Sequence, residues 1–440
     1  MTEVKEPMWR QALSGAQILF VAFGALVLVP ILTGLNPSMA LLGAGVGTII
    51  FQLCTGRQVP IFLGSSFAFI APIVYSTQTW GLPATMCGLF AAGWLYLLLA
   101  LVIKLRGVQF IHRIMPPVVV GPIIMVIGLG LAGVAVNMAM GKTGDGKGVL
   151  VQYDTAILVA GVSLATTAAV ATRAKGIFRL LPVLSGVAAG YILSIFLGLV
   201  DFSKIAAAPW IQVPQLVSPE WNWAAVLFMI PVALAPAIEH VGDVVAIGAV
   251  TGKDYTVKPG LHRTMLGDGL AVCCAGLFGG PPVTTYAEVT GAVMITRCYN
   301  PVIMTWAAGF AIVMAFFGKF NAILQSIPAP VMGGIMMLLF GSIAAVGLNT
   351  LIHARVDMHR PRNLVIVSLV LVFGIGGLTI NIAGQQLHGV SLCGVAAILM
   401  NLLLPMDVPD AALADGADGA DAAGSAAEPL AAAAVPTPAE

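Results

Sequence analysis

Charged residues are scarce in this chain. Only 9% of its 440 residues are Asp, Glu, Lys or Arg, whereas 59% are hydrophobic and the mean hydropathy is +0.99. A soluble domain carries about 25% charged residues. The composition therefore excludes an ordinary soluble protein and indicates a polytopic membrane protein. The formal net charge is +1, which gives no electrostatic reason to expect nucleic acid as a partner.

Reactive cysteine patterns and enzyme motifs are also missing. The six cysteines form no C-x-x-C pair, and all lie in or beside apolar stretches. We interpret them as small buried hydrophobic residues rather than redox groups or metal ligands. G-x-S-x-G, H-E-x-x-H and the Walker loop do not occur. We therefore expect no enzyme activity, no metal and no cofactor.

Long apolar runs are what the chain has in quantity. A helix needs about 20 apolar residues to cross a bilayer. Twelve runs come close to that length: 12–33, 38–55, 84–103, 116–138, 155–171, 182–199, 224–249, 261–278, 301–317, 331–349, 363–380 and 387–404. Two shorter segments, 59–73 and 282–296, are interrupted by Gly, Pro, Ser and Thr and bring the total to fourteen. They fall third and tenth, the same place in each set of seven.

The positions of the basic residues agree with fourteen crossings. On that count 16 of the 20 Lys and Arg lie on the side of the two termini, and only Lys142, Lys147, Lys204 and Lys319 lie on the other. The positive-inside rule then makes the terminal side cytoplasmic. We expect a multi-pass protein of the inner (plasma) membrane with both termini in the cytoplasm.

Two sets of seven spans in tandem must have opposite orientations, because seven is odd. This is the inverted-repeat arrangement of many secondary transporters, in which broken helices meet near the midplane. We predict an all-α polytopic membrane fold of 14 transmembrane segments in two inverted 7-span repeats. Short extended pieces, 60–66 and 281–285, would pair as antiparallel β-strands and satisfy their own amides. The competing interpretation is that spans 3 and 10 contain only ordinary Pro/Gly kinks.

Few ionisable residues lie inside the predicted spans, and such residues are functional-site candidates by default. Glu239 and Asp243 are four apart in span eight and share a helix face. In a low-dielectric site two such carboxylates do not both ionise easily, so the pair can hold one exchangeable proton. Glu288 opens the helical half of span ten, where a helix N-terminus favours a carboxylate.

Two further ionisable residues lie in predicted spans, His240 in span eight and Asp268 in span nine. We expect His240 to be a packing or loop-facing side chain rather than a ligand. Asp268 in span nine is either part of the site or bonded to neighbouring backbone.

The carboxylates lie in sequence beside Phe67 and Tyr286, and this combination suggests a kind of ligand. It suits a small planar molecule whose ring stacks on the aromatic side chains and whose N–H edges meet the carboxylates. A hard cation is the competing interpretation, although no dense acidic cluster supports it.

Several longer motifs carry a family resemblance. "LGSSFAFIAP", "EHVGD", "PGLHRTMLGDGL", "GGPPVTTYAEVTGAVMITR" and "IPAPVMGGIMMLLFG" resemble the nucleobase–ascorbate transporter family, also called nucleobase:cation symporter-2, and within it the bacterial uracil permease branch. The resemblance runs from about residue 12 to 404. It implies a homodimer that moves its core domain like an elevator against a gate domain.

The resemblance also implies a domain division. The N-terminus is 1–11, the core domain 12–103 and 224–320, and the gate domain 104–223 and 321–406. Residues 407–440 hold seven acidic residues and no basic one, and we predict a disordered, Ala-rich cytoplasmic tail.

Site residues are implied position by position. The resemblance makes Glu239 and Glu288 binding residues for the base. The other implied pocket residues are Phe67, Tyr286, Ala287 through its backbone, Phe340 and Gln17. Proton coupling is expected at Glu239 and Asp243.

Four positions depart from the family pattern. They are Ile18, Asp243, Val283 and Val289, where relatives have His, His, Asn and Asn. These positions bear on which base the protein binds and on how transport is coupled to protons.

The sequence therefore predicts a proton-coupled nucleobase symporter, with uracil as the first candidate substrate. The alternatives are a xanthine or uric acid permease of the same family and an anion transporter of the sulfate-permease type. A membrane receptor or scaffold that uses the acidic tail is a third possibility.

Overall fold

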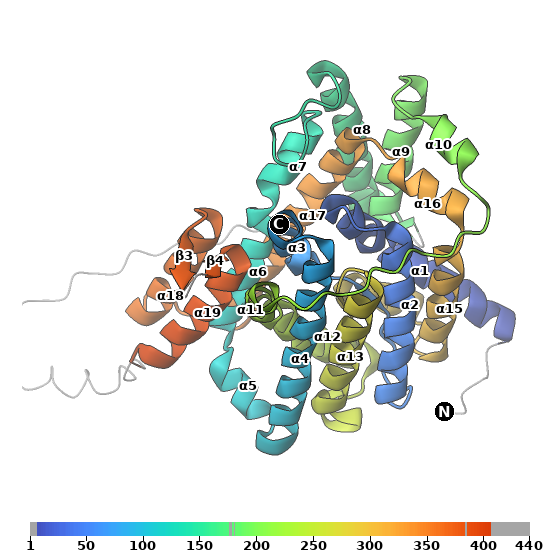
Figure 1. Ribbon diagram of the computed structural model, residues 1–440. Coiled ribbons are helices and arrows are strands. Elements are labelled where there is room, and N and C mark those ends of the chain that lie inside the picture. The colour runs from blue at the N-terminus through green and yellow to red at the C-terminus, as the bar shows by residue number, and fades with distance from the viewer. Residues whose placement is uncertain (1–6, 176–177, 180, 383–384, 406–440) are drawn as a thin grey trace, which may run out of the picture.

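The computed structural model describes residues 7–175, 178–179, 181–382 and 385–405. In this part of the chain the protein is a bundle of helices with two small two-stranded sheets (Figure 1). The predicted acidic tail 407–440 and residues 1–6 lie outside the described residues.

The first half of the chain contains α1 (Met8–Thr33), α2 (Pro37–Cys54), β1 (Leu63–Ser65), the 3-10 turn η1 (Phe67–Phe69), α3 (Ile70–Trp80), α4 (Leu82–Arg106), α5 (Val108–Ile114), α6 (Pro117–Gly130), α7 (Ala132–Ala139), α8 (Tyr153–Arg173), α9 (Pro182–Phe196) and α10 (Phe202–Ala207). The second half contains α11 (Trp223–Val232), α12 (Leu234–Thr251), the π-helical turn η3 (Thr256–Gly260), α13 (Leu261–Phe278), β2 (Val283–Thr285), α14 (Ala287–Thr296), α15 (Val302–Ala315), α16 (Gly318–Gln325), α17 (Ala329–His353), α18 (Pro361–Ile375), β3 (Thr379–Ile382), β4 (Gln385–His388) and α19 (Gly389–Leu403).

Every segment predicted from the apolar runs falls on one or more of these elements. By length and composition, seven helices of the described chain could cross a membrane, if α6 is counted with α7 and α11 with α12. Four more helices, α9, α15, α18 and α19, are apolar but shorter. The fourteen-span count and the inverted repeat stay predictions.

The last two predicted apolar runs, 363–380 and 387–404, are helical over shorter ranges than expected. Helix α18 ends at Ile375 and α19 begins at Gly389, and β3 pairs with β4 in the space between them. Two glycines, at 376 and 377, follow the end of α18, and the second has a φ of 70°, which an L side chain rarely adopts. The β-branched residues of β3 then favour a strand.

The two interrupted segments meet at the centre of the fold. Strand β1 pairs antiparallel with β2, with Leu63 opposite Thr285, Gly64 opposite Thr284 and Ser65 opposite Val283. The predicted pairing of two short extended pieces is therefore found, although the strands are shorter than the predicted ranges. Each strand leads into a helical segment, η1 and α3 after β1 and α14 after β2.

Side chains of helix α2 form hydrogen bonds with the backbone at the start of β1 and just before it. Thr48 Oγ1 accepts a hydrogen bond from Leu63 N at 2.9 Å. Gln52 Nε2 donates to the carbonyls of Val59 and Ile61 at 2.8 and 3.2 Å. Gln52 and Thr48 are both buried. Two polar side chains in an otherwise apolar helix thus supply partners that water would provide in a soluble protein.

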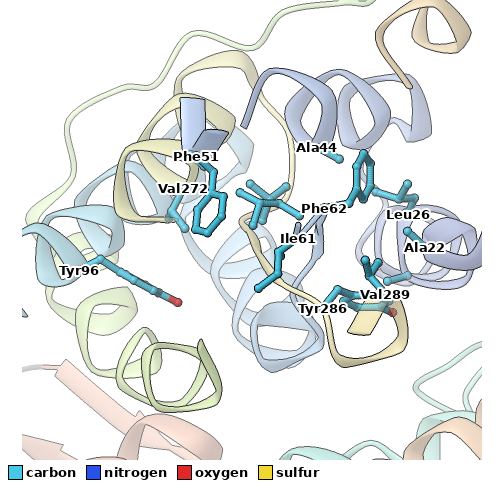
Figure 2. Packing of buried hydrophobic residues seen from close by; sticks show 14 of the residues in the cluster. Ala22, Leu26, Ala44, Phe51, Ile61, Phe62, Tyr96, Val272, Tyr286 and Val289 are labelled. Carbon is cyan, nitrogen blue, oxygen red and sulfur yellow. The ribbon is translucent and has the colours of Figure 1, made fainter. Parts of the chain in front are cut away.

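The largest hydrophobic cluster surrounds the paired strands. It draws only on residues between 18 and 103 and between 228 and 315. Figure 2 shows part of it, with Phe62 and Tyr286 from the ends of the strand segments among residues of α1, α2 and α13. Two further clusters join α7, α8 and α17 to α1, and α6 to α18 and α19.

Helices α4 and α13 approach closely through glycines. A Cβ added at Gly93 would lie 2.4 Å from Cys273 Sγ and 2.8 Å from the carbonyl oxygen of Gly269. A Cβ at Gly269 would lie 2.6 Å from Tyr96 Cβ. Small residues at such contacts let membrane helices pack backbone to backbone.

We expect Gly93→Ala to destabilise the fold, because the added methyl group has no space between α4 and α13. Overpacking of this kind costs about 1–3 kcal/mol. The melting temperature of the purified protein in detergent should fall by several degrees. Gly161→Ala is the matched control, because a Cβ there meets nothing within 4 Å. Equal melting temperatures for the two variants would contradict the close packing.

Candidate functional site

A cavity of about 280 Å³ lies beside the paired strands. Glu239 from α12, Glu288 from the first turn of α14, Phe67 from η1 and Tyr286 at the end of β2 line one side of it. The rest of the lining comes from α6, α8, α9 and α17 and is mostly apolar. Small-molecule sites typically occupy roughly 300–1,000 Å³, so this cavity suits a small ligand.

The two aromatic side chains lie at the strand ends of the cavity. The ring centroids of Phe67 and Tyr286 are 6.3 Å apart and the rings are tilted by 31°. Phe67 also meets Phe340 in an edge-on contact, with centroids 6.4 Å apart and an angle of 87°. Tyr286 is buried, Phe67 is half-buried, and both line the cavity.

Two carboxylates hold strand β2 from opposite faces. Thr284 Oγ1 donates to Asp268 Oδ2 at 2.9 Å, and Thr285 Oγ1 donates to Asp243 Oδ2 at 2.9 Å. Successive strand residues point to opposite faces. The adjacent threonines therefore tie β2 to α13 on one face and to α12 on the other. These bonds fix the strand that leads into Tyr286 and Glu288.

His240 was predicted to be a packing or loop-facing side chain. It is fully buried, which agrees with the first of these alternatives. Its Nδ1 lies 3.3 Å from Asp268 Oδ2, and its Nε2 lies 3.0 Å from Thr264 Oγ1. The sequence pattern gave no sign of this partner, because His240 and Asp268 are on different helices. Asp268 bonds to side chains here rather than to neighbouring backbone.

In the part of the chain that the structure describes, the acidic residues of this region have no basic ion-pair partner other than His240, which lies beside Asp268. Among the residues that the structure describes, no Lys or Arg forms a salt bridge with Glu239, Asp243 or Glu288. Glu288 is accessible from the cavity, Glu239 is half-buried and Asp243 is buried. An unpaired buried carboxylate is costly as an anion, so such groups are suited to carry a proton or to accept ligand N–H bonds.

The other predicted site residues are Asp243, Phe340, Ala287 and Gln17, and their positions relative to the cavity differ. Asp243 faces Thr285 rather than the cavity lining. Phe340 is buried behind Phe67, and Ala287 is the first residue of α14. Gln17 is a half-buried residue of α1 that is not among the residues lining this cavity. The structure thus brings Glu239, Glu288, Phe67 and Tyr286 to one cavity.

Two polar residues of the cavity wall were missed by sequence reasoning. Thr167 on α8 and Ser342 on α17 line the cavity together with the glutamates. Each hydroxyl donates to a carbonyl one turn back in its own helix, to Ser163 and Leu338, at 2.8 Å. A lone Ser or Thr in an apolar helix is a weak signal, because this back-bonding satisfies it without a ligand.

Fold and site together define a class of protein: a multi-pass helical membrane protein with a small cavity, lined by two glutamates, two aromatic side chains and apolar residues, beside a pair of short strands. The profile of the permease family matches residues 10–382, and the chain belongs to this family.

Named relatives cover most of the chain. It is 56% identical over 396 residues to a probable uracil permease of Haemophilus influenzae, covering 90% of this chain and 94% of that protein. It is 47% identical to the uracil permease of Bacillus caldolyticus, covering 88% and 90%. The uracil permease of Escherichia coli K12 is 38% identical, with 89% and 90% covered.

Solved structures share the fold at low sequence identity. The transmembrane domain of the cyanobacterial bicarbonate transporter BicA superposes with a TM-score of 0.64 at 15% identity, covering 90% of this chain and 97% of that one. The murine anion transporter Slc26a9 superposes with a TM-score of 0.67 at 12% identity, covering 91% and 69%. These likenesses concern the fold alone.

We expect Thr284→Val to lower stability, because it removes the hydroxyl donor to the buried Asp268 carboxylate. His240 Nδ1 still lies 3.3 Å from the same oxygen, so we expect the loss of one hydrogen bond, about 0.5–1.5 kcal/mol. Thr284→Ser should retain most of the stability, and Thr172→Val, at an exposed position, should change little. Thermal melts in detergent would measure all three variants.

A double-mutant cycle with Asp268→Asn makes this prediction specific. If the two side chains interact, the combined loss should be smaller than the sum of the single losses. Strictly additive losses would show that the Thr284–Asp268 bond contributes nothing to stability.

Proposed function

We propose that the protein is a nucleobase permease, with uracil as its first substrate. The observation that carries this proposal is that Glu239 and Glu288 share one small cavity with Phe67 and Tyr286. The relatives named as uracil permeases, at 38–56% identity over most of the chain, support the same substrate class. A purine such as xanthine or uric acid is the alternative within the family.

The chemistry of the cavity fits a planar ring with N–H donors. Carboxylate oxygens accept hydrogen bonds from ring N–H groups, and a charged acceptor strengthens each bond. The aromatic faces of Phe67 and Tyr286 offer stacking surfaces. The apolar wall on α17 excludes water from the other face of the ring. Sulfate or another anion suits this cavity poorly, because both glutamates would repel it unless protonated.

Proton coupling at Glu239 and Asp243 is part of the proposal. The two carboxylates are one helical turn apart in α12, and no Lys or Arg of the described chain pairs with either. A proton taken up at this pair from outside would remove the penalty of a buried anion and allow a neutral base to bind. Release of base and proton to the cytoplasm would complete import.

The movement we propose is an elevator-type shift of a core domain, 12–103 and 224–320, against a gate domain, 104–223 and 321–406. Its support is the largest hydrophobic cluster, which lies wholly within the two core ranges. Such a body can move as one unit because its own contacts are satisfied internally. A homodimer in the inner membrane, with both termini cytoplasmic, completes the proposed arrangement.

The first test is ligand stabilisation. A ligand at 100 times its Kd stabilises the folded state by about 2.7 kcal/mol. Uracil should therefore raise the melting temperature of the purified protein by more than thymine, xanthine, uric acid, adenine or sulfate. A larger shift with xanthine or uric acid would move the substrate to the purine class, and a shift with sulfate alone would exclude nucleobase transport.

The second test concerns Glu239. Glu239→Gln should weaken uracil binding roughly 10- to 100-fold, because a hydrogen bond to a charged group contributes about 1.5–3 kcal/mol. Uracil accumulation driven by a pH gradient in proteoliposomes should be lost. Glu220→Gln, in an exposed loop, is the matched control. It should leave uracil binding and proton-driven accumulation unchanged. Full proton-driven uptake by Glu239→Gln would contradict the coupling site.

A further inference from the structure

Phe67 lies between two cavities of the described chain. It lines the site cavity described above, and it also lines a second cavity of about 280 Å³ formed with Ala68, Ala71, α6 and the segment after α18. No other described residue lines both of these cavities. The side chain therefore stands at the boundary between them.

The second cavity continues toward one end of the molecule. It shares Ala71, Gly130 and Leu131 with a larger cavity of about 660 Å³. That larger cavity lies between α3 and the turn after α7, where Thr143, Asp145 and Gly148 line it. Lys142 and Lys147 of this turn belong to the small group of basic residues predicted to face the outside. We call this space the outer vestibule.

The site cavity continues toward the other end. It shares Ala171, Pro182, Val183 and Glu288 with a cavity of about 240 Å³ that reaches Arg179. Arg179 belongs to the larger group of basic residues, predicted to be cytoplasmic. A row of cavities thus runs from Asp145 to Arg179, and Phe67 divides it.

The contacts of Phe67 fit a side chain that separates two cavities. The ring contacts Tyr286 on one side and the buried Phe340 on another. It also packs against all three of the large hydrophobic clusters. Tyr286 belongs to the first cluster and Phe340 to the second. The ring therefore fills the junction at which the bodies proposed as core and gate meet.

We propose that Phe67 is the barrier that closes the path between the outer vestibule and the base site in this conformation. The identity of the molecule that crosses rests on the proposed function, but the barrier itself does not require a base. Truncating the ring would join the two cavities of about 280 Å³ into one passage. The base site would then be reachable from both sides at once.

Thiol accessibility tests this barrier directly. The reporter is Ala171→Cys, an exposed position that lines both cavities on the Arg179 side. The half-buried native cysteines Cys54, Cys274 and Cys298 are replaced by Ala so that they do not react. A membrane-impermeant methanethiosulfonate is added to oriented vesicles from the vestibule side. Ala71→Cys reports that the reagent enters the vestibule.

With Phe67 present, the reporter at 171 should be unreactive from the vestibule side, while Cys at 71 reacts. In the Phe67→Ala background the reporter at 171 should react at least tenfold faster, with the rate at 71 unchanged. An unchanged rate at 171 in Phe67→Ala would overturn the proposal. Rapid labelling at 171 with Phe67 intact would overturn it as well.

Two further variants serve as controls. One tests whether labelling reflects a general loosening of the packing, and the other separates closure of the path from stacking of the ring on the ligand. Phe320→Ala removes another half-buried ring that packs against the same first and second clusters but does not line these cavities. It should leave the reporter at 171 unreactive, and labelling there would count against a specific barrier. Phe67→Leu should keep the path closed while the uracil-induced rise in melting temperature decreases.

The two proposals fail separately in this design. If no nucleobase shifts the melting temperature of the wild-type protein, the proposed function fails, yet the labelling rates still decide the barrier. If uracil stabilises the protein and Phe67→Ala leaves position 171 closed, the barrier alone is wrong.

Discussion

Backbone hydrogen bonding in the interior of a membrane protein is the constraint on which the rest of this structure depends. Non-helical backbone at that depth survives only where protein groups satisfy it. Here β1 and β2 satisfy each other, and Thr48 and Gln52 of α2 serve the residues before β1. The bonds from Thr48 and Gln52 are local in sequence, whereas the pairing of β1 with β2 joins segments more than two hundred residues apart, so the backbone beside the cavity is satisfied only in the assembled fold.

Acidic side chains at the centre of the fold also hold the paired strands in place. The hydroxyls of Thr284 and Thr285 donate to Asp268 and Asp243, so two carboxylates hold the strand that leads into Tyr286 and Glu288. Carboxylates without a Lys or Arg partner in the described chain are unfavourable as anions. The strand contacts and the acidic side chains that line the cavity therefore lie in one small region.

The rest of the cavity lining has a different physical character. It is built from α6, α8, α9 and α17, which present mainly apolar side chains to the cavity. The acidic and aromatic groups are therefore confined to the segments around β1, β2 and α12. Apolar contacts do not depend on direction, whereas hydrogen bonds do. The two parts of the lining therefore differ in how strictly their contacts fix relative position.

Sequence by itself indicated the membrane class and the positions of most helices, because apolar runs are local properties. The recurrence of the same interruption at the same place in each half predicted the pairing of two extended pieces. It also singled out Glu239, Glu288, Phe67 and Tyr286, which the structure brings to one cavity. Only the tertiary structure decided that His240 meets Asp268, that Thr167 and Ser342 line the cavity with the glutamates, and that a hairpin replaces the ends of two predicted helical runs. Those features depend on which side chains of different helices face each other, and spacing along a single chain does not specify such contacts.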